Sequence, residues 1–245
     1  MRSYAIGDIH GQLARLHHAH KLIEADKARV ADPDAPVVHV GDLVDRGPDS
    51  RGVIGFLRAG VRGDAPWVVL KGNHDRLFAR FVTNPDWQDE KLSPGLTYLH
   101  PLIGGQETLM SYGLYRKTSF HLREAQAEAA QAVPPEDLAF LDALPLTFHH
   151  GQALFVHAGL RPGVPLHAQT EQDLIWIRDP FLFDTRDHGA LVVHGHTAIE
   201  RPMHYRNRLN IDSRAGYGGP LTAVVIEGRD CFLLTEDGRV PILPL

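Results

Sequence analysis

Short apolar runs alternate with helix-like stretches through the first third of the chain. The runs at residues 2–6, 35–40 and 66–72 have the length of buried strands. Each is followed by apolar residues at helical spacing, at 13–26, 50–60 and 73–82. Strands that alternate with helices in this way pair in parallel through right-handed crossovers. The pattern therefore predicts an α/β fold built on a parallel sheet.

The pattern changes after residue 84. Residues 85–150 are predicted to be mostly helical, with helix-forming stretches at 122–132 and 134–144, and to form an insert over the rest of the fold. Strand patterns then return at 152–159, 190–196, 208–212, 220–228 and 231–240. The last two are predicted to form an antiparallel hairpin across Glu227–Asp230. Together these elements predict mixed sheets flanked by helices.

Polar clusters stand where five of the predicted strands end. Ligands of open α/β sheets bind outside the carboxyl ends of the strands, so these clusters are expected to converge on one site. The clusters are GDIHG (7–11), GDLVDRG (41–47), GNHD (72–75), HAG (157–159) and HGH (194–196).

The residue types in these clusters suit a pair of divalent metal ions. Asp8 and His10 are two residues apart, so on an extended strand end their side chains would point the same way. A carboxylate such as Asp42 can bridge two ions, and Asn73 offers a neutral oxygen. Mixed carboxylate, amide and imidazole ligands suit Mn, Fe or Zn rather than calcium. The candidate ligands are Asp8, His10, Asp42, Asn73, His157 and His196.

Each cluster also has a plain structural interpretation. Asp8, Asn73 or Asp75 could cap the helix that follows, and His157 could be a hydrogen-bonded core histidine. Asp45 could be a turn acid, and Arg46 a surface arginine. The metal hypothesis depends on all five clusters occurring together at strand ends.

In this order the motifs resemble the phosphoprotein phosphatase family of metallophosphoesterases, especially its small bacterial and phage Ser/Thr protein phosphatases. The resemblance runs from about residue 3 to residue 226. It includes GGQETLMSYG (104–113), FVHAGLRPGVPL (155–166), LIWIRDPF (174–181) and NIDSRAGYGGPLTAV (210–224). GDLVDRG is highly specific, whereas GNHD and HGH are shared by many metallophosphoesterases. The resemblance implies a metallophosphoesterase-type β-sandwich of mixed sheets.

The resemblance also implies roles for individual residues. Asp42 would bridge the two metals, which the six candidate ligands would hold, and manganese is the expected ion. Arg46 and Arg178 would bind the substrate phosphate. His74 would be the general acid, oriented by Asp45. A hydroxide shared by the two metals would then attack the phosphorus of a phosphoserine or phosphothreonine protein directly.

The chain departs from the family pattern at four positions. Ala198 stands where HGHTP has proline, and Ser213 and Arg214 replace Thr and Gly of NIDTGA. Asp75 replaces the glutamate of GNHE, and His194 matches no family ligand. Arg214 could be a third substrate contact or a surface residue, and the sequence leaves both open.

Three other functions remain open. A symmetrical diadenosine tetraphosphate hydrolase has a similar GDLV-x-RGP motif, although it often lacks an acid at the position of Asp45. The second is a broad-specificity phosphomonoesterase. The third is a non-enzymatic metal-binding scaffold, which is disfavoured because no ligand, His74 or arginine is missing.

Length and composition limit the number of domains, the disulfides and the partners that the chain can have. A length of 245 residues suits one domain over 1–245. The single cysteine, Cys231, excludes an internal disulfide and fits the cytoplasm, and its place in the C-terminal hairpin predicts a packing role. The net charge of −5 argues against nucleic-acid binding. No membrane contact is expected, because no apolar run is long enough to span a membrane and the first residues do not have the pattern of a signal peptide. The oligomeric state is left open.

Two histidine pairs lie outside these motifs. His17 and His20 of HHAH would be neighbours on a helix, either as a peripheral metal site or as a solvated face. His149 and His150 are predicted to lie in a loop before a strand.

Overall fold

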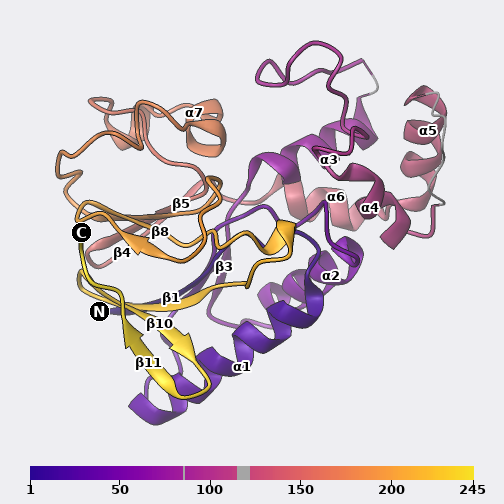
Figure 1. The fold of residues 1–245 in the computed structure, drawn as a ribbon. Helices are drawn as coiled ribbons and strands as arrows, with labels where there is room; N and C mark the ends of the chain where they lie inside the picture. The colour runs from indigo at the N-terminus through magenta and orange to yellow at the C-terminus, as the bar shows by residue number, and fades with distance from the viewer. Residues whose placement is uncertain (85, 115–121) are drawn as a thin grey trace.

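The computed structural model describes residues 1–84, 86–114 and 122–245. Two mixed sheets pack face to face, with most helices outside them (Figure 1). The first sheet has the order β11-β10-β9-β1-β2-β3 and the second β4-β5-β6-β8-β7. The first contains β1 (Arg2–Ile6), β2 (Val37–His39), β3 (Trp67–Val69), β9 (Ala223–Glu227), β10 (Asp230–Thr235) and β11 (Gly238–Pro241). The second contains β4 (Thr147–His150), β5 (Ala153–Val156), β6 (Leu191–His194), β7 (Met203–His204) and β8 (Arg208–Asn210). The predicted α/β class with mixed sheets is confirmed.

Strand alternation divides the core into layers. Ala5 and Val38 of the first sheet pack against Phe155 and Val193 of the second, whereas Tyr4, the neighbour of Ala5, belongs to the cluster on the opposite face. That opposite face is covered by α1 (Leu13–Val30), α2 (Ser50–Arg62) and α3 (Asn73–Thr83). The outer face of the second sheet packs against α7 (Glu171–Trp176). Successive side chains of a strand point to opposite faces, so each sheet contributes to two cores.

The segment between the two halves of the fold is less helical than predicted. It contains α4 (Gly105–Ser111), α5 (Leu122–Ala132) and α6 (Pro135–Asp142), but residues 86–104 form turns, and 85 and 115–121 lie outside the described residues. His149 and His150 were predicted to lie in a loop, which is wrong, because both belong to β4 and pair with β5. Strand pairing with a partner already in the core outweighs the polar character of this short edge strand.

The C-terminal boundary of α2 also differs from the prediction. The N-cap is Asp49, whose side chain accepts a hydrogen bond from the Gly52 N–H at 2.8 Å, and the helix begins at Ser50, where the apolar spacing predicted it. Gly60 does not end the helix, which continues to Arg62. A side chain at Gly60 would collide with the Trp67 ring, so this glycine permits close packing of the helix on β3.

The C-terminal region forms one more strand than predicted. Asp230 pairs with Glu227, which confirms the hairpin of β9 and β10. The predicted strand over 231–240 is split by a turn at Glu236–Asp237 into β10 and β11. Cys231 is buried between the two sheets, which confirms its packing role, and burial raises the pKa of its thiol to about 12.

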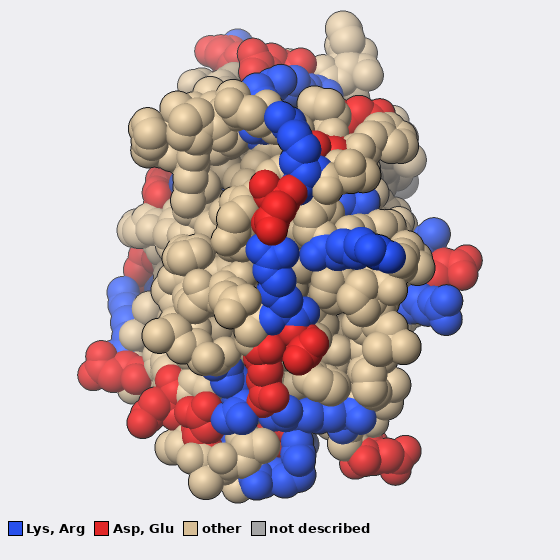
Figure 2. Space-filling model, turned by 90° about the vertical axis from the view of Figure 1, so that its left-hand side faces the viewer, with Lys and Arg blue, Asp and Glu red and all other residues tan. Residues whose placement is uncertain are grey.

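Basic and acidic side chains alternate on the surface near both termini, and no large area of this face carries a single sign (Figure 2). Ion pairs of this kind join Arg2 to Asp32 at 2.6 Å and to Glu227 at 2.7 Å. Among the described residues, no helix is both long and apolar enough to span a membrane.

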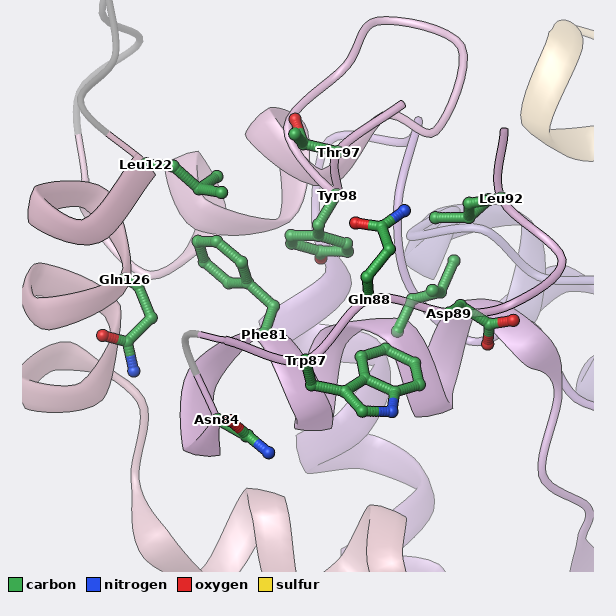
Figure 3. Close-up of a pocket in the computed structure, with 11 residues that line it drawn as sticks. Phe81, Asn84, Trp87, Gln88, Asp89, Leu92, Thr97, Tyr98, Leu122 and Gln126 are labelled. Carbon is green, nitrogen blue, oxygen red and sulfur yellow. The ribbon is translucent and has the colours of Figure 1, made fainter. Parts of the chain in front are cut away.

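A small cavity of about 30 Å³ lies between α3, α5 and the turns of residues 86–104. Its wall includes Phe81 and Tyr98, whose rings are 4.8 Å apart, and also Trp87 and Gln126 (Figure 3). The turns of this segment are therefore anchored on α3 through aromatic packing.

Candidate metal centre and active site

The five polar clusters meet where the carboxyl ends of the parallel strands of both sheets lie side by side. β1, β2 and β3 run parallel in the first sheet, and β5 and β6 run parallel in the second. The loops that follow them carry the predicted residues to one place, as the sequence indicated. Every one of the six predicted metal ligands is buried there.

The sequence predicted an extended backbone at Asp8 and His10. The backbone at these strand ends is instead tightly turned. His10 has φ of 46°, Asp42 of 51°, and His196 of 63°, all in the left-handed region. Hydrogen bonds from the Ile9 and His10 N–H groups to the Asp42 carbonyl, at 3.0 and 2.8 Å, join the first two loops. Tight left-handed turns, not strand alternation, bring the side chains together.

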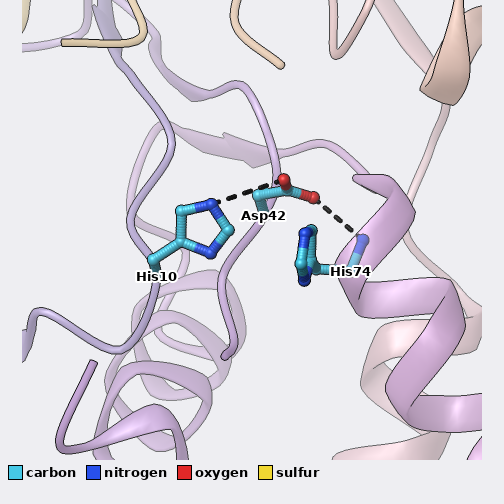
Figure 4. A group of neighbouring side chains, drawn as sticks. All are labelled: His10, Asp42 and His74. Carbon is cyan, nitrogen blue, oxygen red and sulfur yellow. Dashed lines mark hydrogen bonds and ion pairs between the residues drawn. The ribbon is translucent and has the colours of Figure 1, made fainter. Parts of the chain in front are cut away.

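Asp42 belongs to two groups of possible ligands, one with His10 and His74 (Figure 4) and one with His157 and His196. Its Oδ2 is 3.6 Å from His10 Nε2, and its Oδ1 is 3.3 Å from His157 Nε2. Oδ1 also accepts the His74 backbone N–H at 3.0 Å. One carboxylate thus faces both halves of the site, as a bridging ligand would.

Several acceptor atoms in the site point at one another. His157 donates Nδ1–H to the Val40 carbonyl at 2.9 Å, so its neutral ring directs the Nε2 lone pair at Asn73 Oδ1, 3.0 Å away. His10 donates Nδ1–H to the Val44 carbonyl at 2.8 Å, so its Nε2 carries the lone pair that could ligate a metal. His196 Nδ1 is 2.9 Å from the same Asn73 oxygen. Lone pairs gathered in this way suit a cation between them.

The electrostatics of the site agree with a metal-binding role. Burial lowers the pKa of His10, His157 and His196, which favours the neutral imidazole that ligates metals. Burial and the neighbouring Asp212 and Asp42 raise the pKa of Asp8 well above its ordinary value. Buried carboxylates crowded together need positive charge to remain ionised.

Two buried atoms of the set have no hydrogen-bond partner among the described residues. They are Asp8 Oδ1 and His196 Nε2, while Asp8 Oδ2 accepts the His196 N–H at 3.0 Å. Buried polar atoms are rarely left without partners unless an ion or water completes them. The donor set therefore fits divalent metal ions, and the ligand atoms that lie close together are those of His10, Asp42 and His74 in one group and of Asp42, His157 and His196 in the other.

Asp45, Arg46 and His74 form a second group beside the ligands. His74 Nδ1 is 2.6 Å from Asp45 Oδ2, and the Asp45 side chain is completely buried. Arg46 reaches His10 Nε2 at 2.5 Å and His74 Nε2 at 2.9 Å through two different guanidinium nitrogens. The turn at 41–47 thus places a carboxylate behind His74 and a cation in front of it.

Arg178 lies on the opposite side of the site, in the loop after α7. Its Nη2 donates to the His196 carbonyl at 3.4 Å, and its charge contributes to lowering the pKa of His196. Its position is compatible with the phosphate contact expected from the sequence.

Several residues support the site. Asp75 accepts the Gly72 N–H at 2.8 Å at the start of α3, which confirms it as a helix cap, and it also accepts the backbone N–H groups of Asp42 and Leu43 at 3.0 and 2.8 Å, which the sequence did not predict and which fix the 41–47 turn to α3. Tyr98 and Thr108 hydrogen-bond to Asp45. Thr108 lies inside the recognised stretch GGQETLMSYG, but nothing in the sequence marked Tyr98.

Three histidines that the sequence singled out lie outside the proposed metal centre. His194 is buried, accepts from Arg208 at 3.3 Å and packs edge-on against Phe181, so it is not a ligand. The prediction that HHAH forms a solvated face is wrong for His20, which is buried. The Nε2 atoms of His20 and His39 are 3.0 Å apart. His17 is exposed and stacks on Phe56.

The sequence model of the family described as calcineurin-like phosphoesterase matches residues 1–216. The chain belongs to this family. The protein is a metal-dependent phosphoesterase, and its buried aspartates, histidines and asparagine are the ligands that the structure offers for the divalent ions that the family uses.

Relatives within the family differ in substrate. The chain is 26% identical over 243 residues to the asymmetrical bis(5'-nucleosyl)-tetraphosphatase PrpE of Anoxybacillus flavithermus, covering 89% of this chain and 88% of that protein. It is 29% identical over 232 residues to serine/threonine-protein phosphatase 1 of Salmonella typhimurium, covering 91% of each. A cold-active protein-tyrosine phosphatase from a psychrophilic Shewanella species shares the fold, with a TM-score of 0.65 at 15% identity over 99% of this chain and 80% of that one.

Proposed function

We propose that this phosphoesterase is a protein phosphatase that removes phosphate from phosphoserine and phosphothreonine side chains, with the phosphoprotein as its partner. The observation that carries the proposal is the buried pair of Asp45 and His74, joined at 2.6 Å. A serine or threonine alkoxide is a poor leaving group, so its departure needs a proton. The phosphate chain released from a dinucleoside tetraphosphate needs one much less.

In this proposal, Asp45 accepts the Nδ1–H of His74, which leaves Nε2 to hold the proton that is transferred. In this structure Nε2 accepts a hydrogen bond from Arg46 Nη2 at 2.9 Å, so Arg46 would turn to the bound phosphate before Nε2 carries that proton. His74 gives that proton to the departing oxygen, and the carboxylate of Asp45 stabilises the charged imidazolium.

Arg46 and Arg178 would bind the non-bridging phosphate oxygens, since a guanidinium can donate two parallel hydrogen bonds to phosphate. Asp8, His10, Asp42, Asn73, His157 and His196 would hold two divalent ions, of which manganese is our expectation. When bound, such a pair supplies positive charge and makes water a nucleophile at neutral pH. No side chain needs to be phosphorylated in this scheme.

The proposal is tested by replacing His74 and varying the leaving group. His74→Ala should lower kcat/KM on a phosphothreonine peptide by about 10²–10⁴-fold, the usual contribution of a general acid. The loss on para-nitrophenyl phosphate should be much smaller, because its phenolate departs without a proton. Equal losses on both substrates would contradict the assignment of His74.

Dinucleoside tetraphosphates are a second candidate substrate class. Tyr217 is 58% exposed, and its ring centre lies 4.6 Å from the Arg46 guanidinium, so a nucleobase could stack beside the phosphate site. The similarity to PrpE also favours this candidate. Hydrolysis of diadenosine tetraphosphate, assayed beside the phosphopeptide, separates the two candidates.

A further inference from the structure

The carboxylate of Asp45 is held by two hydroxyl groups from outside its own turn. Tyr98 donates to Asp45 Oδ1 at 2.6 Å, and Thr108 donates to the same oxygen at 2.8 Å. The Asp45 backbone N–H is bonded in turn to Thr108 Oγ1 at 2.8 Å and to Ser50 Oγ at 3.1 Å. Both Oδ1 and the backbone are therefore fixed, and Oδ2 remains for His74.

These contacts come from parts of the chain that contain none of the proposed ligands. Tyr98 lies in the turns of residues 86–104, and Thr108 lies in α4. Both are buried, and the Tyr98 ring packs against Phe81 at the wall of the small cavity (Figure 3). The inserted segment thus reaches the active site through two hydroxyl groups.

We propose that Tyr98 and Thr108 are positioning residues for proton transfer by His74. The inference rests on the proposed function, because it assigns the two hydroxyls to the general-acid step. A carboxylate held by one hydrogen bond could rotate away from the imidazole. Rotation of Asp45 would break both hydroxyl contacts in a buried environment, so the Oδ2–Nδ1 contact keeps its geometry.

A purely structural role would satisfy the buried carboxylate without affecting His74. The chain contains a matched control for that role, because Tyr112 donates to Asp137 Oδ2 at 2.9 Å and both residues are buried. This second tyrosine–aspartate pair links the end of α4 to α6, and among the described residues its tyrosine contacts Phe78 and Arg51 but makes no hydrogen bond to Asp45, Arg46 or His74. Tyr112→Phe therefore removes a comparable hydrogen bond away from the proton transfer.

The test combines Tyr98→Phe with His74→Ala in a double-mutant cycle on the manganese-loaded full chain, with a phosphothreonine peptide as substrate. Tyr98→Phe alone should lower kcat by about 10-fold with little change in KM, as expected for loss of one hydrogen bond to a charged group. In the His74→Ala background it should cost nothing further. Tyr112→Phe should leave kcat unchanged in both backgrounds.

Thr108 provides a second, independent arm. Thr108→Val removes the hydroxyl at nearly constant volume and should lower kcat on the peptide, whereas Thr108→Ser should retain most of the activity. Thermal unfolding of every variant identifies any that fail to fold. If Thr108→Val does not fold, Thr108→Ser and Tyr98→Phe still test the inference.

The outcomes separate this inference from the proposed function. Equal costs of Tyr98→Phe in both backgrounds, or an effect no larger than that of Tyr112→Phe, would overturn the positioning role while leaving His74 as the acid. A Thr108→Ser variant as slow as Thr108→Val would also overturn it. If His74→Ala does not slow peptide hydrolysis, the proposed function fails, and the inference falls with it.

Discussion

At the scale of single residues, the site depends on backbone conformations that most side chains avoid. His10, Asp42, Asp45, Arg46 and His196 all have φ between 46° and 73°. Residues other than glycine in this region are uncommon and cluster at functional sites, where surrounding contacts hold them. The sequence identified these residues by type and order, but it could not show that tight turns, and not an extended strand end, would aim them.

Glycines complete the same geometry where a side chain would enter the site. A Cβ at Gly195 would overlap Asp8 Oδ1 and approach Val40. We expect Gly195→Ala to displace Asp8, reducing bound metal and lowering kcat by at least about 10-fold, because misplacing a group at a reaction centre is costly. Metal content by mass spectrometry and phosphatase assays measure both effects.

Gly55→Ala is the matched control for that variant. Gly55 lies inside α2 with open space around it, so alanine should leave metal content unchanged. It should raise the free energy of unfolding by about 0.5–1 kcal/mol, because alanine favours the helix. Full metal content in Gly195→Ala would contradict the proposed role of Asp8.

Arg214 shows how a departure from the family pattern is accommodated. It occupies a left-handed position with φ of 67°, where the family often has glycine, and its side chain is exposed. Its guanidinium lies 5.7 Å from the Tyr217 ring centre. Stacking on this exposed ring gives the side chain a partner, and both interpretations of Arg214 made from the sequence stay predictions.

At the scale of elements, the segments within distinct apolar runs were predictable and those outside such runs were not. Strands β1, β2 and β3 and helices α1 to α3 carry strong apolar patterns, and each was expected. The strands β4 and β7 and helices α4 and α7 were not identified, because each is short and lies outside the predicted apolar runs. Tertiary contacts stabilise these pieces instead, because β4 and β7 pair with neighbouring strands, α4 packs against α2 and α7 packs against the second sheet.

The contact between α1 and β2 predicts a dependence of stability on pH. His20 and His39 lie 3.0 Å apart in the core, and burial lowers the pKa of His39 to about 3 and that of His20 to about 4. Both rings stay neutral in the folded protein, whereas an unfolded histidine gains a proton near pH 6.5. The unfolded chain therefore binds more protons below that pH, and the free energy of unfolding falls as the pH decreases toward 4.

Replacing both histidines with leucine should weaken this dependence. Between about pH 7.5 and pH 5 the wild type should lose on the order of 4 kcal/mol more than the His20→Leu, His39→Leu double variant, about 2 kcal/mol for each histidine. Removing both partners avoids an unpaired buried nitrogen. Denaturant unfolding at the two pH values measures the difference, with His18→Leu, an exposed position on α1, as the control. Parallel pH profiles for wild type and double variant would contradict this account.

At the scale of the whole molecule, the metal centre joins loops from both sheets. Asp42 belongs to the first sheet's loops, and His157 and His196 follow strands of the second. Ligands that bind only the folded state raise its stability in proportion to the logarithm of their concentration. Manganese at about one hundred times its dissociation constant should therefore raise Tm by on the order of 5–10 °C over chelator-treated protein.

Calorimetry with and without chelator measures this shift, and activity should be lost and regained in parallel with it. Asp42→Asn should abolish most of the shift, because the residue faces both halves of the site. A Tm that does not respond to metal while activity does would show that the two sheets are not joined through the ions.

The account's central claim concerns the substrate, and one comparison tests it most directly. We would measure kcat/KM of the manganese-loaded protein on a phosphothreonine peptide and on diadenosine tetraphosphate under the same conditions. The buried pair of Asp45 and His74 predicts a clear preference for the peptide. A preference for the dinucleotide would contradict the protein phosphatase assignment and would favour the exposed Tyr217 ring as part of a nucleotide site.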